Sequence, residues 1–152
     1  MSWPPVVGGG VSWQTSADNW ITEGLATYSS LIYLRERKGE KEFRAVLRRF
    51  RRSVNLYAAK GVPADGAKLK LLNRDIRVYQ ALVYAKPALM LAELADTIGE
   101  AELCLRLRGI LEAQRCRNLG TEQFLGLLSG GDPALGARLN AWICSRGLPK
   151  DL

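Results

Sequence analysis

The sequence contains no histidine, and this absence excludes more kinds of active site than any other feature of its composition. Without histidine the chain cannot form a Ser-His-Asp or Cys-His catalytic pair, an H-E-x-x-H zinc site or a Cys/His zinc finger. Cysteine is scarce as well, and Cys104, Cys116 and Cys144 include no C-x-x-C pair. An odd number of isolated cysteines argues against a disulfide framework and favours buried thiols or a reducing compartment.

Long apolar runs are also missing. No stretch approaches the roughly 18 apolar residues of a membrane span, and the N-terminus has neither a charged n-region nor a long apolar core. We therefore expect no membrane span and no signal peptide. The 152 residues are 47% hydrophobic and 24% charged, as is typical of one globular domain, and the net charge of +7 permits anionic partners.

The pattern along the chain predicts an all-α fold of about six helices. Residues 1–12 contain two prolines and three consecutive glycines, so we expect an irregular lead-in followed by a single helical domain over 13–152. Beyond it, apolar residues recur at three- and four-residue steps and strand patterns are essentially absent. The expected helices run from Ser16 or Asp18 to Gly39, and over about 40–60, 86–98, 100–115, 121–128 and 133–146.

Two boundaries depend on single residues. Proline suits the first turn of a helix, so Pro87 predicts a helix start near Lys86, preceded by an entering turn or a short helix. Thr121 is expected to cap the short helix that follows it. Residues 61–74 contain Gly-Val-Pro and Asp-Gly and are expected to form a connecting loop, at least in their first half.

The segment Trp20–Tyr28 reads W-I-T-E-G-L-A-T-Y. It resembles the W-L-x-E-G-F-A-x-Y segment of aminopeptidase-N-like zinc metallopeptidases (gluzincins, peptidase family M1). In that family the Glu is the third zinc ligand, about eighteen residues after the second histidine of H-E-x-x-H. Counting back from Glu23 places that histidine at Pro4. The intervening register matches at Gly8, Val11, Trp13, Asp18 and Trp20.

A second segment, 83–88, reads V-Y-A-K-P-A and resembles the family's V-Y-x-K-G-A, with Pro87 where Gly is usual. The closing segments resemble the helices that follow in the family, so the resemblance extends from about Gly8 to Leu152. It implies the fold of the C-terminal helical subdomain of a thermolysin-like (gluzincin) catalytic domain.

The resemblance also implies roles for three residues. Glu23 would be a zinc ligand, Tyr84 would stabilise the oxyanion of the tetrahedral intermediate, and Tyr79 would line the substrate pocket. Catalytic zinc needs three protein ligands, which a single carboxylate does not provide. We therefore expect zinc, peptide substrate and the remainder of the catalytic domain to belong to a larger parent, and this chain alone to be inactive. Substrate preference, and exopeptidase versus endopeptidase activity, stay open.

A different hypothesis is that the chain is a non-catalytic helical module that binds protein or anions. A lone Glu on an amphipathic helix is commonly solvated, and a Tyr before a helix commonly packs. Trp13, Trp20 and Trp142 are expected in the core.

The main basic segment contains nine Lys or Arg and three Glu between Arg35 and Arg52. We expect Arg44, Arg48, Arg51 and Arg52 to form a solvated helix face opposite the apolar stripe, with no specific nucleic-acid partner. If the chain is an excised lobe, it would expose an apolar face through which it could self-associate.

Overall fold

The computed structural model describes residues 11–13, 15–57, 75–115 and 117–149, most of which are helical. Its elements, in chain order, are β1 (Val11–Trp13), the 3₁₀ turn η1 (Ser16–Asp18), α1 (Asn19–Lys38), α2 (Glu40–Tyr57), α4 (Ile76–Gln80), the π-helical turn η3 (Ala81–Ala85), α5 (Lys86–Ile98), α6 (Glu100–Ala113), β2 (Arg117–Leu119), α7 (Thr121–Leu128) and α8 (Pro133–Cys144). The all-α expectation is confirmed.

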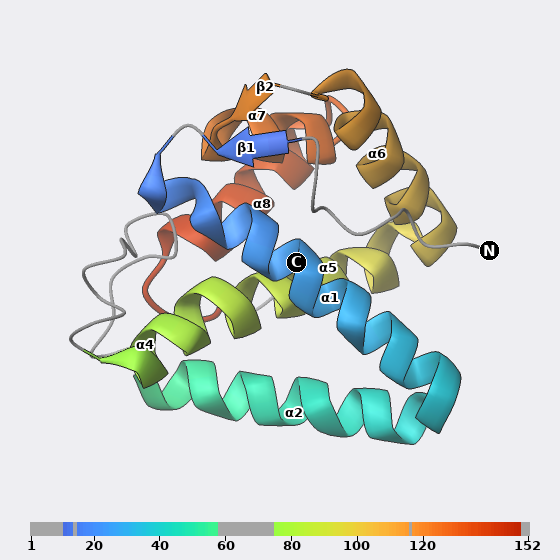
Figure 1. Ribbon diagram of the computed structural model, residues 1–152, viewed down its shortest axis with the longest axis vertical. Coiled ribbons are helices and arrows are strands. Elements are labelled where there is room, and N and C mark those ends of the chain that lie inside the picture. The colour runs from blue at the N-terminus through green and yellow to red at the C-terminus, as the bar shows by residue number, and fades with distance from the viewer. Residues whose placement is uncertain (1–10, 14, 58–74, 116, 150–152) are drawn as a thin grey trace.

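Helix α5 lies at the centre of the assembly (Figure 1). Every residue from Lys86 to Ala92 is buried, as is typical of a helix covered on all sides. Helices α1 and α2 pack against α5 and η3, while α6 and α8 contact α5 and are joined to each other through α7. The site described below lies where α1, α2 and η3 meet.

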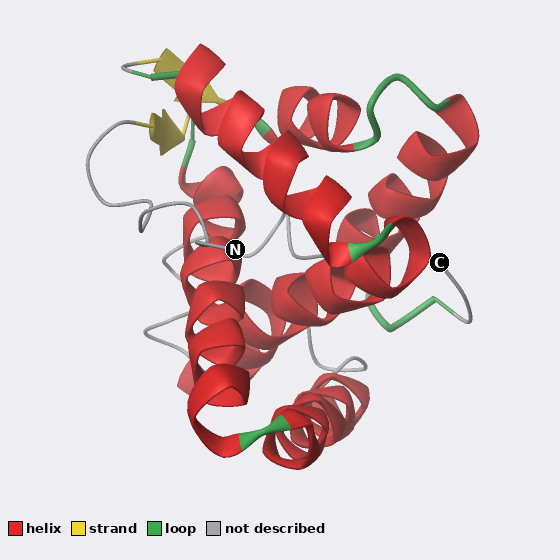
Figure 2. Cartoon of the chain, turned by 90° about the vertical axis from the view of Figure 1, so that its right-hand side faces the viewer, coloured by secondary structure: helices red, strands yellow, loops and turns green. Residues whose placement is uncertain are grey.

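The expectation that strands are essentially absent is corrected by one small feature. Strands β1 and β2 pair in parallel, with Val11 opposite Arg117 and Trp13 opposite Leu119, at the edge of the helical assembly (Figure 2). Val11 and Ser12 therefore belong to a strand and not to an irregular lead-in. Runs of three residues are too short to show alternation in a sequence, which is why the pattern did not predict them.

The expected helix start at Lys86 is confirmed, and a short helix precedes it, but the chain does not break there. Helices α4 and α5 are joined through η3 into a continuous helical segment. Pro87 lacks an N–H, and its ring would collide with the carbonyl of the residue four positions earlier in a regular helix. The π-helical turn ends two residues before Pro87 and includes Val83, the residue whose carbonyl the ring would meet in a regular helix.

Other boundaries are close to expectation. Gly39 and Gly99 follow α1 and α5 with φ of 89° and 92°, conformations that glycine adopts readily. Thr121 is the first residue of α7 and does not cap it, because its hydroxyl binds Asp18 instead. The expected end of the second helix at Lys60 and the loop 61–74 lie outside the described residues.

The core expectations hold where they can be compared. Trp20 and Trp142 are each 1% exposed, whereas the side chain of Trp13 lies outside the described part. Cys104 is buried, Cys144 is half-buried and donates to Asn140, and Cys116 lies outside the described residues. None of the described helices is both long and apolar enough to cross a membrane.

Candidate functional site

Glu23 and Tyr84, which are far apart in the sequence, meet in the structure. Glu23 lies one turn into α1, and Tyr84 lies in η3 directly before α5. The Glu23 carboxylate lies close enough to the Tyr84 phenol to raise its pKa, and both side chains are half-buried. The structure thus brings the expected metal ligand and the expected oxyanion stabiliser close together.

The electrostatics of this pair favour a protonated phenol. Burial raises the pKa of Tyr84, and the nearby Glu23 carboxylate raises it further. Tyr84 therefore remains a hydrogen-bond donor throughout the neutral pH range.

A close helix contact holds the pair together. A Cβ atom added at Gly24 would lie 2.4 Å from the Cβ of Pro87, so α1 and α5 approach more closely than any larger residue allows. Pro87, the departure from the resembling motif, is the residue that fills the space.

Tyr79 is a buried residue that packs against the ring of Tyr84. It is 1% exposed, and its hydroxyl accepts a hydrogen bond of 2.7 Å from Nδ2 of Asn19. Its ring packs edge-to-face on Tyr84 with centroids 6.2 Å apart. These contacts fix the orientation of the Tyr84 ring, while the role of Tyr79 in lining a substrate pocket stays a prediction.

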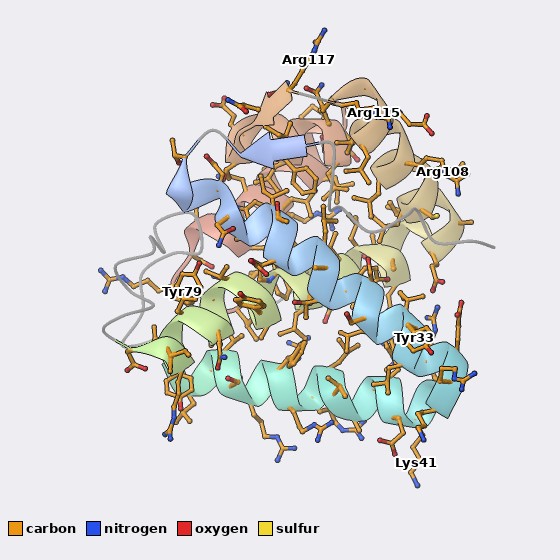
Figure 3. All side chains as sticks on the ribbon, viewed as in Figure 1. Tyr33, Lys41, Tyr79, Arg108, Arg115 and Arg117 are labelled. Atoms are coloured by element: carbon orange, nitrogen blue, oxygen red, sulfur yellow. The ribbon has the colours of Figure 1, made fainter. Side chains whose placement is uncertain are left out.

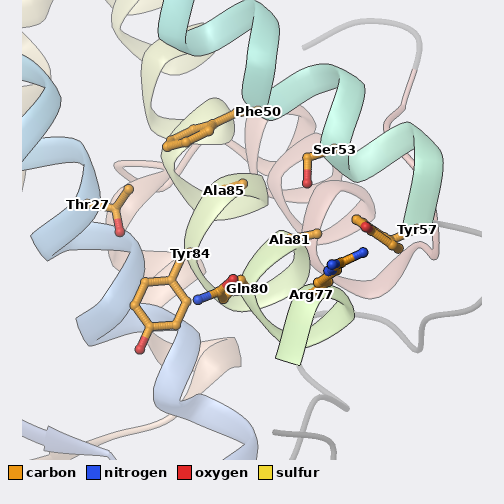
Figure 4. Close-up of a pocket in the computed structure, with 9 residues that line it drawn as sticks. All are labelled: Thr27, Phe50, Ser53, Tyr57, Arg77, Gln80, Ala81, Tyr84 and Ala85. Carbon is orange, nitrogen blue, oxygen red and sulfur yellow. The ribbon is translucent and has the colours of Figure 1, made fainter. Parts of the chain in front are cut away.

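A pocket of about 450 Å³ opens beside this pair, between α1, α2 and the α4–η3 segment (Figure 4). Tyr84 is part of its wall, and Thr27, one turn after Glu23, is another part. Its lining residues are Thr27, Phe50, Ser53, Tyr57, Arg77, Gln80, Ala81, Tyr84 and Ala85. The volume falls within the range of small-ligand sites, about 300–1,000 Å³.

A polar network that sequence reasoning missed fixes the start of α1. The Asp18 carboxylate accepts from the backbone N–H and hydroxyl of Thr121, at 2.8 and 2.7 Å, and from the same two groups of Thr15, at 3.0 and 2.9 Å. Nε1 of Trp20 donates to the Thr121 hydroxyl at 2.9 Å. Burial by itself raises the pKa of Asp18, but the hydrogen bonds from Thr121 and Thr15 outweigh burial and lower it. The sequence register had singled out Asp18 and Trp20 as matches to the resembling family. It gave no indication that Thr121 is the residue to which both are hydrogen-bonded.

Lys86 makes a second contact that the sequence analysis did not predict. Its side chain is fully buried, and its ammonium donates to the backbone carbonyl of Ser145 and lies 3.4 Å from the Ser145 hydroxyl. The first residue of α5 is therefore tied to the residue that follows α8.

The arginines of α2 lie differently from expectation. Arg44 makes two bonds to Asp96, of 2.9 and 3.2 Å, and Arg51 pairs with Glu93, so both reach across to α5. Arg44 and Arg51 therefore lie beside the apolar stripe of α2, on the side that faces α5, and not on the opposite face of the helix. Arg48 and Arg52 are exposed, in agreement with a solvated face.

The described residues contain no group of three His, Cys, Asp or Glu side chains that could hold a metal ion. At the candidate site they provide one carboxylate, Glu23, for a metal that needs three protein ligands. A single carboxylate fits a metal site only where the other protein ligands come from elsewhere.

No protein-family model matches the sequence, and no curated protein matches it. Solved structures do match. A mutant M1 zinc metallopeptidase from Deinococcus radiodurans, bound to a Tyr-Ser-Ala substrate, is 22% identical with a TM-score of 0.71, covering 88% of this chain and 29% of its own. A mutant two-domain M1 zinc metallopeptidase bound to L-tryptophan is 24% identical with a TM-score of 0.72, covering 95% of this chain and 31% of its own.

The non-mutant D. radiodurans enzyme is similar at 22% identity and a TM-score of 0.67, over 88% of this chain and 28% of that one. This chain thus spans between 28% and 31% of the lengths of these three structures. The TM-scores show a shared fold, and at identities of 22–24% the likeness shows the fold alone. The chain has the fold of a helical part of the M1 zinc metallopeptidases, as the sequence resemblance implied.

Proposed function

We propose that this chain supplies one side of a zinc-peptidase active site, with Glu23 as a metal ligand and Tyr84 as the oxyanion stabiliser. The observation that supports this proposal most is the proximity of the Glu23 carboxylate to the Tyr84 phenol, whose pKa the carboxylate raises. Both residues come from segments that resemble M1 motifs, and they meet on a fold shared with M1 zinc metallopeptidase structures.

The chemistry follows from what each side chain offers. Zinc, when bound, polarises the scissile carbonyl and activates water. Glu23 contributes a carboxylate oxygen to the metal, and the Tyr84 phenol donates a hydrogen bond to the oxygen that becomes negative. Because Tyr79 and Asn19 fix the ring of Tyr84, the donor is oriented before substrate binds.

The remaining ligands must come from outside these residues, since the sequence contains no histidine. The partner in this proposal is the rest of a catalytic domain that carries H-E-x-x-H, and the substrate is a peptide. An aminopeptidase type of activity is the finer form of the proposal. A tripeptide substrate bound to a structural neighbour supports a peptide ligand of this size.

The test compares the chain alone with the chain combined with a segment that bears H-E-x-x-H. We expect the chain alone to show no stoichiometric zinc by elemental analysis and no peptide hydrolysis, and the combination to show both. In the combination, Glu23→Gln should abolish zinc binding. Tyr84→Phe should keep zinc and lower kcat by about 10²–10³-fold, as loss of an oxyanion donor does elsewhere.

Glu112→Gln serves as the matched control, because Glu112 is an exposed carboxylate on α6. Stoichiometric zinc or zinc-dependent hydrolysis by the chain alone would overturn the proposal. Full zinc occupancy in the Glu23→Gln combination would overturn it equally.

A second candidate function is that of a helical protein- or anion-binding module without catalysis. The exposed arginines of α2, Arg48, Arg49 and Arg52, favour it. Binding to anionic polymers that weakens steeply with salt and is lost in a triple Gln variant would support this function. Absence of binding at low salt would exclude it.

Self-association is a further part of the lobe hypothesis. Several large apolar side chains are exposed, among them Tyr33 at 62%, Leu56 at 68% and Leu105 at 63%. We propose that surfaces of this kind contact the remainder of a catalytic domain and pair with each other in its absence. A monomer at high concentration in sedimentation experiments would contradict this.

A further inference from the structure

The pocket beside Tyr84 combines aromatic surfaces with a cation. Phe50 and Tyr57 of α2 form half-buried aromatic parts of its wall, and Arg77 of α4 is exposed at its edge. In the close-up, Arg77 and Tyr57 lie toward one end of the pocket, and Tyr84 and Thr27 lie toward the other (Figure 4). An apolar wall with a few polar groups is the usual composition of a small-ligand site.

Three polar side chains of this pocket have no hydrogen-bond partner among the described residues. Within the described residues, the side chains of Arg77, Gln80 and Ser53 make no hydrogen bond or ion pair. Asp75, the nearest carboxylate in sequence, instead accepts from the backbone N–H groups of Arg77 and Val78 at 3.1 and 3.2 Å. No group of the described residues thus pairs with the guanidinium of Arg77, whose planar fork suits a carboxylate in particular.

The distance from Arg77 to Tyr84 suits a short peptide. The two residues lie seven positions apart on one helical segment, which at about 1.5 Å of rise per residue separates them by roughly 10 Å along the axis. Three extended residues span about 10–11 Å. A peptide of that length that contacts the Glu23–Tyr84 pair at one end therefore reaches Arg77 with the other.

We propose that this pocket is a carboxylate subsite for short peptides, in which Arg77 pairs with the carboxylate and Phe50 and Tyr57 pack against the neighbouring apolar side chain. The inference rests on the proposed peptidase function, because it assigns a substrate class to the same site. The carboxylate is either the C-terminus of the peptide or the side chain of an Asp or Glu within it. Both sources present the same group to Arg77.

The experiment titrates the isotope-labelled chain with three peptides and follows side-chain NMR signals of Arg77 and Gln80. The peptides are Ala-Ala-Phe, its C-terminal amide, and Ala-Glu-Phe amide. We expect at least one of the two carboxylate-bearing peptides to bind about tenfold more tightly than Ala-Ala-Phe amide, which has no carboxylate. Tight binding of Ala-Ala-Phe assigns the subsite to the C-terminus, and tight binding of Ala-Glu-Phe amide assigns it to acidic side chains.

Arg77→Gln should abolish the preference for a carboxylate, and Arg117→Gln should preserve it. Arg117 is an exposed arginine on β2 that points away from the molecule far from α4 (Figure 3). Equal affinity for all three peptides, a preference that survives Arg77→Gln, or no response of Arg77 and Gln80 to millimolar peptide would overturn the proposal. Because none of these measurements involves zinc or hydrolysis, the subsite and the zinc-peptidase proposal can fail independently.

Discussion

Two carboxylates near the start of α1, Asp18 and Glu23, are held in opposite ways. Asp18 is 7% exposed and accepts four hydrogen bonds from Thr15 and Thr121, which uses about all the acceptor capacity of a carboxylate. Glu23 is half-buried and lies near the phenol of Tyr84, which lines a pocket. A carboxylate without spare acceptor capacity holds elements together, whereas one with spare capacity next to open space can bind a ligand.

The same contrast extends to the surroundings of each residue. The Asp18 network joins the start of α1 to the start of α7, and Trp20 donates to the same threonine. Around Glu23, by contrast, the nearby pocket has polar side chains that lack partners among the described residues. The predictions below test whether the first region is structural and the second functional.

The largest effect is expected where the two regions share a scaffold, at Gly24. Gly24→Ala places a Cβ atom 2.4 Å from Pro87, so α1 and α5 must separate. We expect a loss of about 3 kcal/mol in the free energy of unfolding, measured by urea denaturation. Gly109→Ala is the matched control, because Gly109 is an exposed position in α6 with nothing within 4 Å of the added Cβ. That control should stabilise the protein by up to about 1 kcal/mol. Equal effects of the two substitutions would refute the close-contact explanation.

The next effect separates the two carboxylates directly. Asp18→Asn replaces one acceptor oxygen with an amide that faces N–H or O–H donors, and should cost about 2 kcal/mol of unfolding free energy. Glu23→Gln keeps an oxygen for the Tyr84 hydroxyl and should change stability by less than about 0.5 kcal/mol. If Glu23→Gln destabilised the chain as much as Asp18→Asn, the division into a structural and a functional carboxylate would be wrong.

The pH dependence of stability should also distinguish them. Because the folded state lowers the pKa of Asp18 below the ordinary aspartate value of 3.8, the contribution of Asp18 to stability is fully present above that pH. The contribution is lost as pH falls through the folded pKa. The stability difference between wild type and Asp18→Asn should therefore shrink as pH is lowered below 3.8 in denaturation experiments. A difference that stays constant down to the acid limit would show that the hydrogen bonds of Asp18 do not depend on its charge.

The smallest effect concerns the phenol of Tyr84. Its pKa is raised from 10.0 by burial first and by Glu23 second. Glu23→Gln removes the charge and should lower the pKa of Tyr84 toward 10.0 without restoring it fully, since burial remains. Tyr84→Phe identifies the Tyr84 signal in an absorbance titration at alkaline pH. An unchanged titration in Glu23→Gln would mean that the two side chains do not interact in solution.

Local patterns anticipated much of this molecule. The helical periodicity located α1, α5, α7 and α8 to within a few residues, because burial of one helix face imposes its spacing on the chain. Gly39 and Gly99 ended helices where expected. The π-helical turn was not anticipated, because the apolar spacing of a segment does not distinguish a π turn from the α-helix around it. The pairing of β1 with β2 was missed for a similar reason, because two three-residue strands depend on each other and not on a local pattern.

The arginines of α2 show where the helical pattern stopped being sufficient. It identified them as polar positions, but it could not show that Arg44 and Arg51 would reach Asp96 and Glu93 of α5. Such pairs between half-exposed groups depend on how two helices cross, which the spacing within one helix does not define.

The sequence by itself determined that the fold is helical, that no histidine is available for a metal or a catalytic pair, and that Glu23 and Tyr84 lie in segments resembling peptidase motifs. Only the tertiary structure decided that these two side chains lie close together, that the ring of Tyr79 packs on Tyr84, and that Tyr84 and Arg77 line one pocket. The physical reason is the distance along the sequence over which each kind of interaction acts. Periodicity and capping act between residues a few positions apart, whereas the site is assembled by the close packing of α1 against α5 across a contact that only a glycine permits.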